Sequence, residues 1–422
     1  MGNTSIWRRV DGWLILFYVF FVFWGWLNLY STVSDGNHTA FFDISERYGK
    51  QLLWMGLSAF LIVAIMLFKY IEYYQFAGVL YLISIALLVG LFPFGKQING
   101  ATSWYVLGTL HFQPAAFAKV ATALMLARYL SNPLVEISRS KTLLKALLIT
   151  GVPAALIAAQ PDLGTALVFS VFPLVLYREG MPGYYLFIGF SAALIFVMAQ
   201  AFGVRPVLIG LVSLTSVFVY RRRKSEKALK RAVLFLFFAV GFLYSTDFIF
   251  NAVLSDRHRD RINILIGKVA HTESFRRGIG YNLNQSLLTI GSGGLMGKGF
   301  LKGTLTKGNF VPAQSTDYIF CTIGEEWGFV GSAGLVILFA LFIARIFYKA
   351  ERQNTRFSRM YGYAVGCFFM VHLLINVGMT LGVVPTIGIP LPFFSYGGSS
   401  LWGFTAMLFI FIKLDAAGGR FL

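Results

Sequence analysis

The feature that most constrains this chain is a series of twelve apolar runs, each close to the length of about 20 residues that crosses a bilayer as a helix. Hydrophobic residues make up 57% of the 422 positions and charged residues only 13%, which excludes an ordinary water-soluble protein. The sequence therefore predicts an all-α, polytopic integral membrane bundle of about 12 spans, with residues 1–422 forming a single domain.

The charge pattern predicts how the chain lies in the membrane. A formal net charge of +18 comes from basic residues that cluster in short loops, as cytoplasmic loops do, so we expect no nucleic-acid partner. Residues 221–231 form the strongest basic block, and we expect this block and both termini to be cytoplasmic. Cys321 and Cys367 fall inside apolar runs, which argues against a disulfide framework or a thiolate metal site.

Residues 251–316 form the longest non-apolar segment, and we expect this segment to be a large outer loop. It contains nine basic and three acidic residues, an excess that runs against the rule for outer loops. An anionic partner explains this excess, either lipid headgroups in general or a phosphate-bearing lipid substrate. The glycine-rich stretch 291–304 is a weak signal for phosphate binding on its own.

Four carboxylates lie in or beside apolar runs. Asp317 precedes a run that continues to Phe347, Glu325 and Glu326 lie inside it, and Asp162 occupies the short turn 158–166 between two runs. An ionisable group in a membrane span is costly and therefore indicates a functional site. The alternatives are an ion pair that only joins helices, for the two glutamates, and a helix N-cap, for Asp162.

The stretch PTIGIPLPFFSYGGSS, residues 385–400, joins the last two runs and contains three prolines and three glycines. Such a segment cannot continue a helix. At membrane depth it is tolerated only where it is buried in protein or lines a cavity. The sequence predicts either a cavity wall or a structural corner here.

Six motifs occur in an order and spacing that resemble the SEDS family of shape, elongation, division and sporulation proteins, and most closely its RodA type. They are NGATSWYVLG (99–108), FQPAAFAK (112–119), AAQPDLGTAL (158–167), YNLNQSLLTIGSGGLMGKG (281–299), FVPAQSTDYIFCTIGEEWGFVG (310–331) and NVGMTLGVVPTIGIPLPFFSYGGSS (376–400). The resemblance runs from about residue 13 to 415.

This resemblance implies a peptidoglycan glycosyltransferase that polymerises lipid II at the outer face of the bacterial cytoplasmic (inner) membrane, for cell-wall elongation. Its implied partners are a class B penicillin-binding protein that acts as transpeptidase, other elongation-complex proteins and membrane lipids. The family's essential acid falls on Asp317, the expected general base. Arg261, Lys298 and Lys302 are candidates for binding the pyrophosphate. A divalent cation, Mg2+ or Mn2+, is an expectation from the family, and no organic cofactor is expected.

The remaining predicted substrate-binding residues are Asp162, Lys119, Glu325, Ser395 and Ser399, the grooves near Asp162 and 395–400 being expected to hold lipid tails or glycan. The chain departs from the family at Ala116, where a Glu is usual, so we expect Lys119 to pair with Glu325 or Asp162 instead. The family core has ten spans, and residues 184–220 read as an extra hairpin. Two alternatives are a lipid II transporter and a non-catalytic scaffold.

Overall fold

The computed structural model describes residues 9–33, 42–98, 100–108, 110–221, 225–253, 256–266 and 279–418. These residues form two compact units. The first takes in the described parts of 1–181, 284–381 and 387–422, and the second takes in those of 182–283 and 382–386. The prediction of one membrane domain, with 251–316 as its outer loop, stays a prediction.

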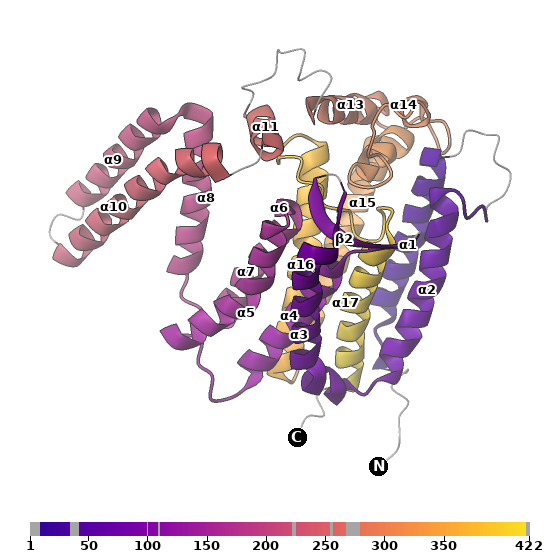
Figure 1. Ribbon diagram of the computed structural model, residues 1–422, viewed down its shortest axis with the longest axis horizontal. Coiled ribbons are helices and arrows are strands. Elements are labelled where there is room, and N and C mark those ends of the chain that lie inside the picture. The colour runs from indigo at the N-terminus through magenta and orange to yellow at the C-terminus, as the bar shows by residue number, and fades with distance from the viewer. Residues whose placement is uncertain are drawn as a thin grey trace. The chain divides into compact units, whose positions relative to one another are not determined.

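The first unit is a bundle of long helices with a small sheet (Figure 1). Its elements are α1 (Gly12–Val33), α2 (Arg47–Leu67), α3 (Tyr70–Phe94), β1 (Lys96–Ile98), β2 (Ala101–Leu107), β3 (Leu110–Phe112), α4 (Pro114–Ser131), α5 (Ser140–Ala159), α6 (Leu163–Val168), η2 (Phe169–Val171), α7 (Phe172–Arg178), residues 284–292 of α13 (Ile279–Ser292), α14 (Thr304–Lys307), α15 (Ile319–Glu351), α16 (Arg356–Thr380) and α17 (Gly398–Ala417).

The second unit contains three long apolar helices and shorter elements that follow them. They are α8 (Tyr184–Phe202), α9 (Val204–Arg221), α10 (Glu226–Phe248), the π-helical turn η3 (Ile249–Val253), α11 (Asp256–Leu265) and the start of α13. Ile195, Ala199, Ala239 and Leu243 form the core where α8 meets α10.

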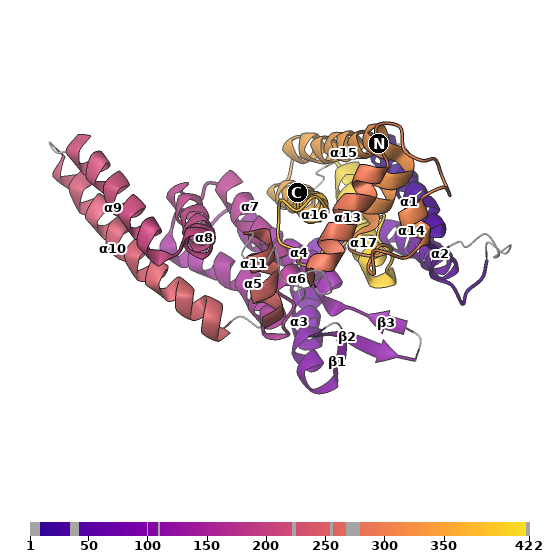
Figure 2. The same ribbon diagram turned by 90° about the horizontal axis from the view of Figure 1, so that it is seen from above.

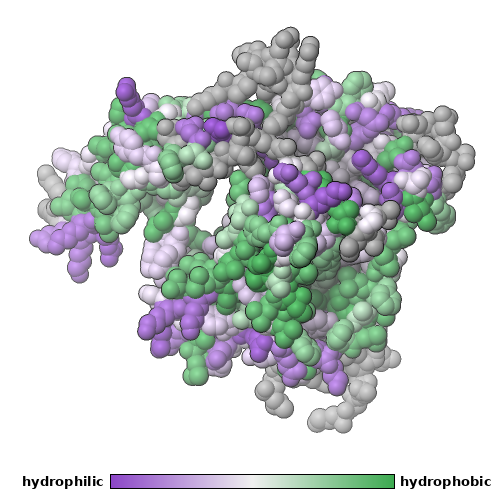
Figure 3. Space-filling view, in the orientation of Figure 1, coloured by the Kyte–Doolittle hydropathy of each residue, from purple (hydrophilic) through white to green (hydrophobic). Residues whose placement is uncertain are grey.

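Ten helices of the described residues are long and apolar enough to cross a membrane. They are α1, α2, α3, α5, α8, α9, the helix that begins at Glu226, α15, α16 and α17. In the first unit, hydrophobic side chains cover the middle of the helices, and hydrophilic side chains gather towards their ends (Figure 3). This distribution confirms the predicted all-α polytopic membrane bundle.

Ten helices of the described part meet the criteria of length and apolarity, so the predicted number of about twelve spans stays a prediction. The other two runs correspond to α4 and to Leu163–Arg178. Helix α4 contains Lys119 and Arg128, and most of its side chains are buried, so it needs fewer apolar residues than a lipid-facing helix. Leu163–Arg178 is shorter and is divided into α6, η2 and α7. The hairpin 184–220 forms as α8 and α9.

The loop between α3 and α4, which the sequence did not reveal as strands, forms a three-stranded antiparallel sheet in the order β1-β2-β3 (Figure 2). Tyr105 pairs with Phe112 across β2 and β3. The Tyr105 hydroxyl donates to the Leu87 carbonyl at 2.9 Å, and the Thr102 N–H donates to the Gln160 carbonyl at 3.1 Å. These bonds fix the sheet to the ends of α3 and α5.

Aromatic side chains fill the core of the first unit between α1, α15 and α16. The rings of Phe21 and Phe339 stack with centroids 4.2 Å apart. Phe393 and Phe394, from the proline-rich stretch between α16 and α17, are buried in this core. A Cβ at Gly25 of α1 would lie 2.6 Å from the Phe393 carbonyl oxygen, so only glycine permits this approach. Residues 389–395 of this stretch are therefore mostly buried in protein, as broken backbone at membrane depth requires.

An ion-pair network ties the first and last helices at the end of the bundle where α1 begins. The Asp11 carboxylate lies 2.8 Å from the Arg345 guanidinium and 3.1 Å from Lys349 Nζ, which also lies 3.1 Å from Asp415. Burial alone would raise the pKa of Asp11, but hydrogen bonds from Arg345 and Lys349 outweigh it and lower the pKa below its ordinary value.

Candidate active site

Asp317 lies half-buried in the turn that leads into α15, at the end of the bundle opposite Asp11. Its backbone carbonyl accepts a hydrogen bond of 2.8 Å from the Asn376 side-chain amide of α16. The same amide donates to the Ile389 carbonyl at 2.7 Å. Asn376 is fully buried, so it holds the Asp317 turn and the stretch after α16 in a fixed relation.

The turn before Asp317 is also bonded directly to that stretch. Ser395 Oγ donates to the Thr316 carbonyl at 2.6 Å, and the Tyr396 N–H donates to the Ser315 carbonyl at 2.9 Å. Arg47 of α2 donates to Ser315 Oγ at 2.6 Å and brings a guanidinium beside the turn. Burial raises the pKa of the Tyr396 hydroxyl, although the Arg47 charge opposes the shift. Ser395 is buried and positions this turn, and its predicted contact with substrate stays a prediction.

The stretch after α16 lies between the two carboxylates that the sequence singled out. A Cβ at Gly388, where φ is 73°, would lie 3.2 Å from Asp317 Oδ2. The adjacent carbonyl of Ile387 meets Gly164, two residues after Asp162, so closely that a side chain there would collide with it. Residues 387–388 therefore touch both the α6 turn and Asp317, as the wall of a site would.

Asp162 is the N-cap of α6, which confirms the capping alternative. Its Oδ1 accepts from the Thr165 N–H at 3.1 Å, and its Oδ2 accepts from Gln113 Nε2 at 3.4 Å. The Gln113 N–H donates to Ser399 Oγ at 3.1 Å, and that hydroxyl donates to the His111 carbonyl at 3.2 Å. Asp162 and Ser399 thus belong to one polar group near the end of the sheet, and their binding of substrate stays a prediction.

Glu325 holds the loop between α13 and α14 against α15. Its carboxylate is fully buried and pairs with Lys298 Nζ at 2.6 Å. It also accepts from the Leu305 N–H at 2.9 Å, the Thr306 N–H at 2.8 Å and Thr306 Oγ1 at 2.6 Å. The predicted substrate roles of Glu325 and Lys298 stay predictions, whereas their pairing is an observed structural role.

The helix that carries Glu325 does not run straight into the bundle. Gly328 interrupts α15 with φ of 66°, and the Gly297 N–H lies directly against it. The glycine-rich loop packs against α15 at this break, and the Lys298 N–H donates to the Glu325 carbonyl at 2.9 Å. Glu326, just before the break, accepts a hydrogen bond from Ser31 at the far end of α1. The glycines at 297 and 328 thus serve close backbone packing between the loop and α15.

Among the described residues, Lys119 forms an ion pair with neither Glu325 nor Asp162, so the expected pairing is wrong. Its Nζ lies 3.2 Å from His372 Nε2 and over the Phe404 ring, 4.9 Å from the ring centroid. His372 Nδ1 lies 2.8 Å from the Phe368 carbonyl, which leaves Nε2 as the acceptor for the ammonium group.

The other two basic side chains that were predicted to bind pyrophosphate lie in different units. Lys302 is exposed in the loop before α14, and Arg261 belongs to α11 of the second unit. No three His, Cys, Asp or Glu side chains of the described residues come together, so these side chains do not fit a metal held by protein ligands alone. Mg2+ commonly takes one or two carboxylates and adds substrate phosphates, and the expected cation stays a prediction.

Three residues that position the site were missed from the sequence: Asn376, Gln113 and Arg47. Asn376 is a buried amide in an otherwise apolar helix, which is a detectable signal because such a group needs a partner. Gln113 stands in the motif FQPAAFAK, next to the Pro that begins α4. Nothing in the sequence around Arg47 links it to Ser315, which is 268 positions away.

Parts of these motifs thus meet around the Asp317 turn, where the buried Asn376 amide holds the Asp317 carbonyl and the Ser395 hydroxyl holds the Thr316 carbonyl. The family model described as "Cell cycle protein", for FtsW, RodA and SpoVE, matches residues 12–417. The chain belongs to this family, which confirms the resemblance seen in its motifs.

The chain is similar to named members of this family. The chain is 31% identical over 414 residues to the peptidoglycan glycosyltransferase RodA of Treponema pallidum, covering 91% of this chain and 92% of the relative. It is 34% identical over 330 residues to the peptidoglycan glycosyltransferase MrdB of Escherichia coli K12, covering 78% and 75%. A solved chain of a peptidoglycan synthase complex that coordinates polymerization and crosslinking shares the fold, with a TM-score of 0.70, 25% identity, and coverage of 98% and 99%.

Proposed function

We infer that this membrane protein is a peptidoglycan glycosyltransferase of cell-wall synthesis, and we propose that Asp317 is its general base. Family membership and the names of the RodA and MrdB relatives carry the activity. The assignment of Asp317 rests on one observation: its carboxylate is half-buried against Gly388 while its backbone is held by Asn376. A base must be held in place near the hydroxyl that it deprotonates.

The proposed substrate is lipid II, a disaccharide-peptide on undecaprenyl pyrophosphate. The acceptor sugar hydroxyl attacks the anomeric carbon of the donor, and Asp317 takes the hydroxyl proton. The bond from the anomeric carbon to the pyrophosphate oxygen breaks, and its electron pair leaves with the pyrophosphate. Positive charge near that leaving group lowers the barrier. A divalent cation would supply such charge when bound.

The chain offers several cations for this purpose. We propose exposed Lys302 and also Arg47, which already lies beside the Asp317 turn, for the first contacts with pyrophosphate. Arg261 and Lys298 remain candidates, although Lys298 would have to share its ammonium group with Glu325. Asp162, Ser395 and Ser399 would line the groove for glycan or lipid, with Lys119 supplying positive charge beneath it.

The charged residues at the ends of the first unit support a proposal for how the protein lies in the membrane. We propose that α4 and Leu163–Arg178 also cross the membrane, which gives twelve crossings and cytoplasmic termini in the bacterial inner membrane. The end with Asp11 carries many basic residues, among them Arg345, Lys349, Arg356 and Arg359, as cytoplasmic ends do. Asp317 then faces outward, where a class B penicillin-binding protein and other elongation-complex proteins would act on the new strand.

The test is polymerisation of lipid II by purified protein in liposomes. Asp317→Asn keeps the side-chain size and removes its basicity, so we expect polymer to fall by at least about 10²-fold with unchanged protein folding. Full polymerisation by this variant would refute the assignment of Asp317. A lipid II transporter would make no polymer even as the wild type, and a scaffold would tolerate the substitution.

A further inference from the structure

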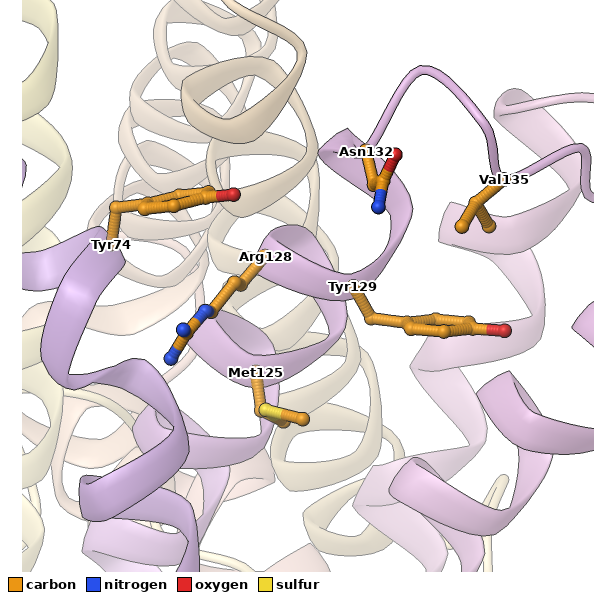
Figure 4. Close-up of a pocket in the computed structure, with 6 residues that line it drawn as sticks. All are labelled: Tyr74, Met125, Arg128, Tyr129, Asn132 and Val135. Atoms are coloured by element: carbon orange, nitrogen blue, oxygen red, sulfur yellow. The ribbon is translucent and has the colours of Figure 1, made fainter.

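A pocket of about 470 Å³ opens between the start of α3 and the end of α4, at the end of the bundle opposite Asp317. Figure 4 shows Tyr74 of α3 on one side, three residues of α4, and the turn that follows α4. The residues that line it are Tyr74, Met125, Arg128, Tyr129, Asn132 and Val135. Nothing in the proposed glycosyl transfer uses this pocket.

Arg128 is the charged group of the pocket. Its Nη1 donates to the Gln75 carbonyl at 3.0 Å, and its guanidinium lies over the Tyr74 ring at 5.4 Å from the centroid. Among the described residues, no carboxylate forms an ion pair with it. A guanidinium has five N–H donors in a planar fork, so most of them remain for an anion that binds in a bidentate manner.

The turn after α4 adds a second donor and an apolar anchor. Asn132 Oδ1 accepts from the Leu134 N–H at 3.0 Å, which leaves the Asn132 amide N–H groups as donors. The same turn presents the Leu134 side chain outward with 87% of its surface exposed. An exposed leucine beside two tyrosines at helix ends is typical of the membrane–water boundary.

The approach to the pocket is basic. Between Asn132 and Lys145 the chain carries Arg139, Lys141 and Lys145 but only one acid, Glu136, which pairs with Arg139 at 2.8 Å. Basic segments beside a membrane attract anionic lipids to the leaflet that they face. An anionic ligand from the bilayer fits this surplus of positive charge.

We propose that this pocket binds the phosphodiester headgroup of an anionic glycerophospholipid in the leaflet next to the α4–α5 turn. Arg128 pairs with the phosphate oxygens and the Asn132 amide donates to the glycerol ester. Met125 and Val135 contact the first carbons of the acyl chains. This inference goes beyond the proposed glycosyl transfer, which takes place at the other end of the unit.

The experiment measures lipid retention by native mass spectrometry, after reconstitution with phosphatidylglycerol and phosphatidylcholine. We expect the wild type to retain phosphatidylglycerol at least tenfold more than Arg128→Gln. The matched control is Arg139→Gln, which removes an exposed arginine outside the pocket whose charge Glu136 already neutralises, so this variant should retain lipid as the wild type does. Equal retention by Arg128→Gln and the wild type, or equal loss in both arginine variants, would overturn the proposal.

A second variant and a thermal-stability measurement complete the test. Val135→Trp leaves Arg128 in place but fills the pocket. We therefore expect this variant to lose the retained lipid, and the result holds even if Arg128→Gln misfolds. Lipid retention by a folded Val135→Trp protein would overturn the proposal. Phosphatidylglycerol should raise the thermal midpoint of the wild type, and inorganic phosphate in phosphatidylcholine should not. Equal protection by free phosphate would also overturn the proposal. Polymerisation by the same preparations reports separately on the glycosyltransferase assignment.

Discussion

Glu325→Gln separates a structural role of this carboxylate from a role in substrate binding. The substitution keeps the shape of the side chain but places an amide nitrogen among donors, including Lys298 Nζ and the Thr306 N–H. Removing one partner of a buried ion pair costs about 3–5 kcal/mol. Unfolding entropy of about 2 cal/mol/K per residue then predicts a fall of roughly 3–6 °C in the thermal midpoint if the 422 residues unfold together.

The measurement is thermal unfolding in detergent, followed by tryptophan fluorescence. Lys298→Met should lower the midpoint less than Glu325→Gln does, because Lys298 is 28% exposed and the carboxylate keeps its Leu305 and Thr306 donors. Lys302→Met, at an exposed position in the same loop, is the control and should leave the midpoint unchanged. If Glu325→Gln leaves the midpoint within about 1 °C of the wild type yet abolishes polymerisation, the structural reasoning is refuted, because the residue then acts on substrate.

Three other outcomes are expected. A single cysteine at Ser225 should resist an impermeant thiol reagent in intact cells while one at exposed Lys302 reacts, and the reverse would contradict the proposed orientation, since Cys321 and Cys367 are buried. The pKa of Asp11 is lowered, so the stability that its ion pairs contribute is complete at neutral pH and is lost only as the pH falls through that lowered pKa. The difference in midpoint between the wild type and Asp11→Asn should therefore persist to pH 5 and shrink below about pH 3.9, and a difference that vanishes at pH 6 would argue against this ion pair. Chelation by EDTA should reduce polymerisation at least tenfold, with recovery on adding Mg2+ or Mn2+, and an unchanged rate would count against the cation.

The sequence predicted the long helices well because their apolarity is local. Runs such as 13–30 appear almost unchanged as α1, since most residues that face lipid or the core are apolar. Helix α4 shows the limit of this reasoning. Its surroundings are protein, so it contains Lys119 without being a lipid-facing span. The sheet was missed because its strands are short and one of them, ATSWYVL, mixes aromatic and polar residues without strict alternation.

The site was predicted in its residue types but not in its partners. Asp317 and Asp162 stand out because carboxylates beside apolar runs are rare and costly. The partner of Lys119 could not be predicted from the sequence, because His372 is 253 positions away and no local pattern marks the pair. The charge of a side chain limits which residues can pair with it, but the packing of the helices determines which of them it meets.

The bonds that hold the Asp317 turn join parts of the chain that are synthesised at different times. Ser315 and Thr316 are bonded to Tyr396 and Ser395, and Ser395 is synthesised 79 positions after Thr316. A nascent chain that has inserted α15 but not α17 therefore has the carboxylate without the framework that aims it. A truncated chain that stops before residue 395 should therefore insert into the membrane without forming this framework around Asp317.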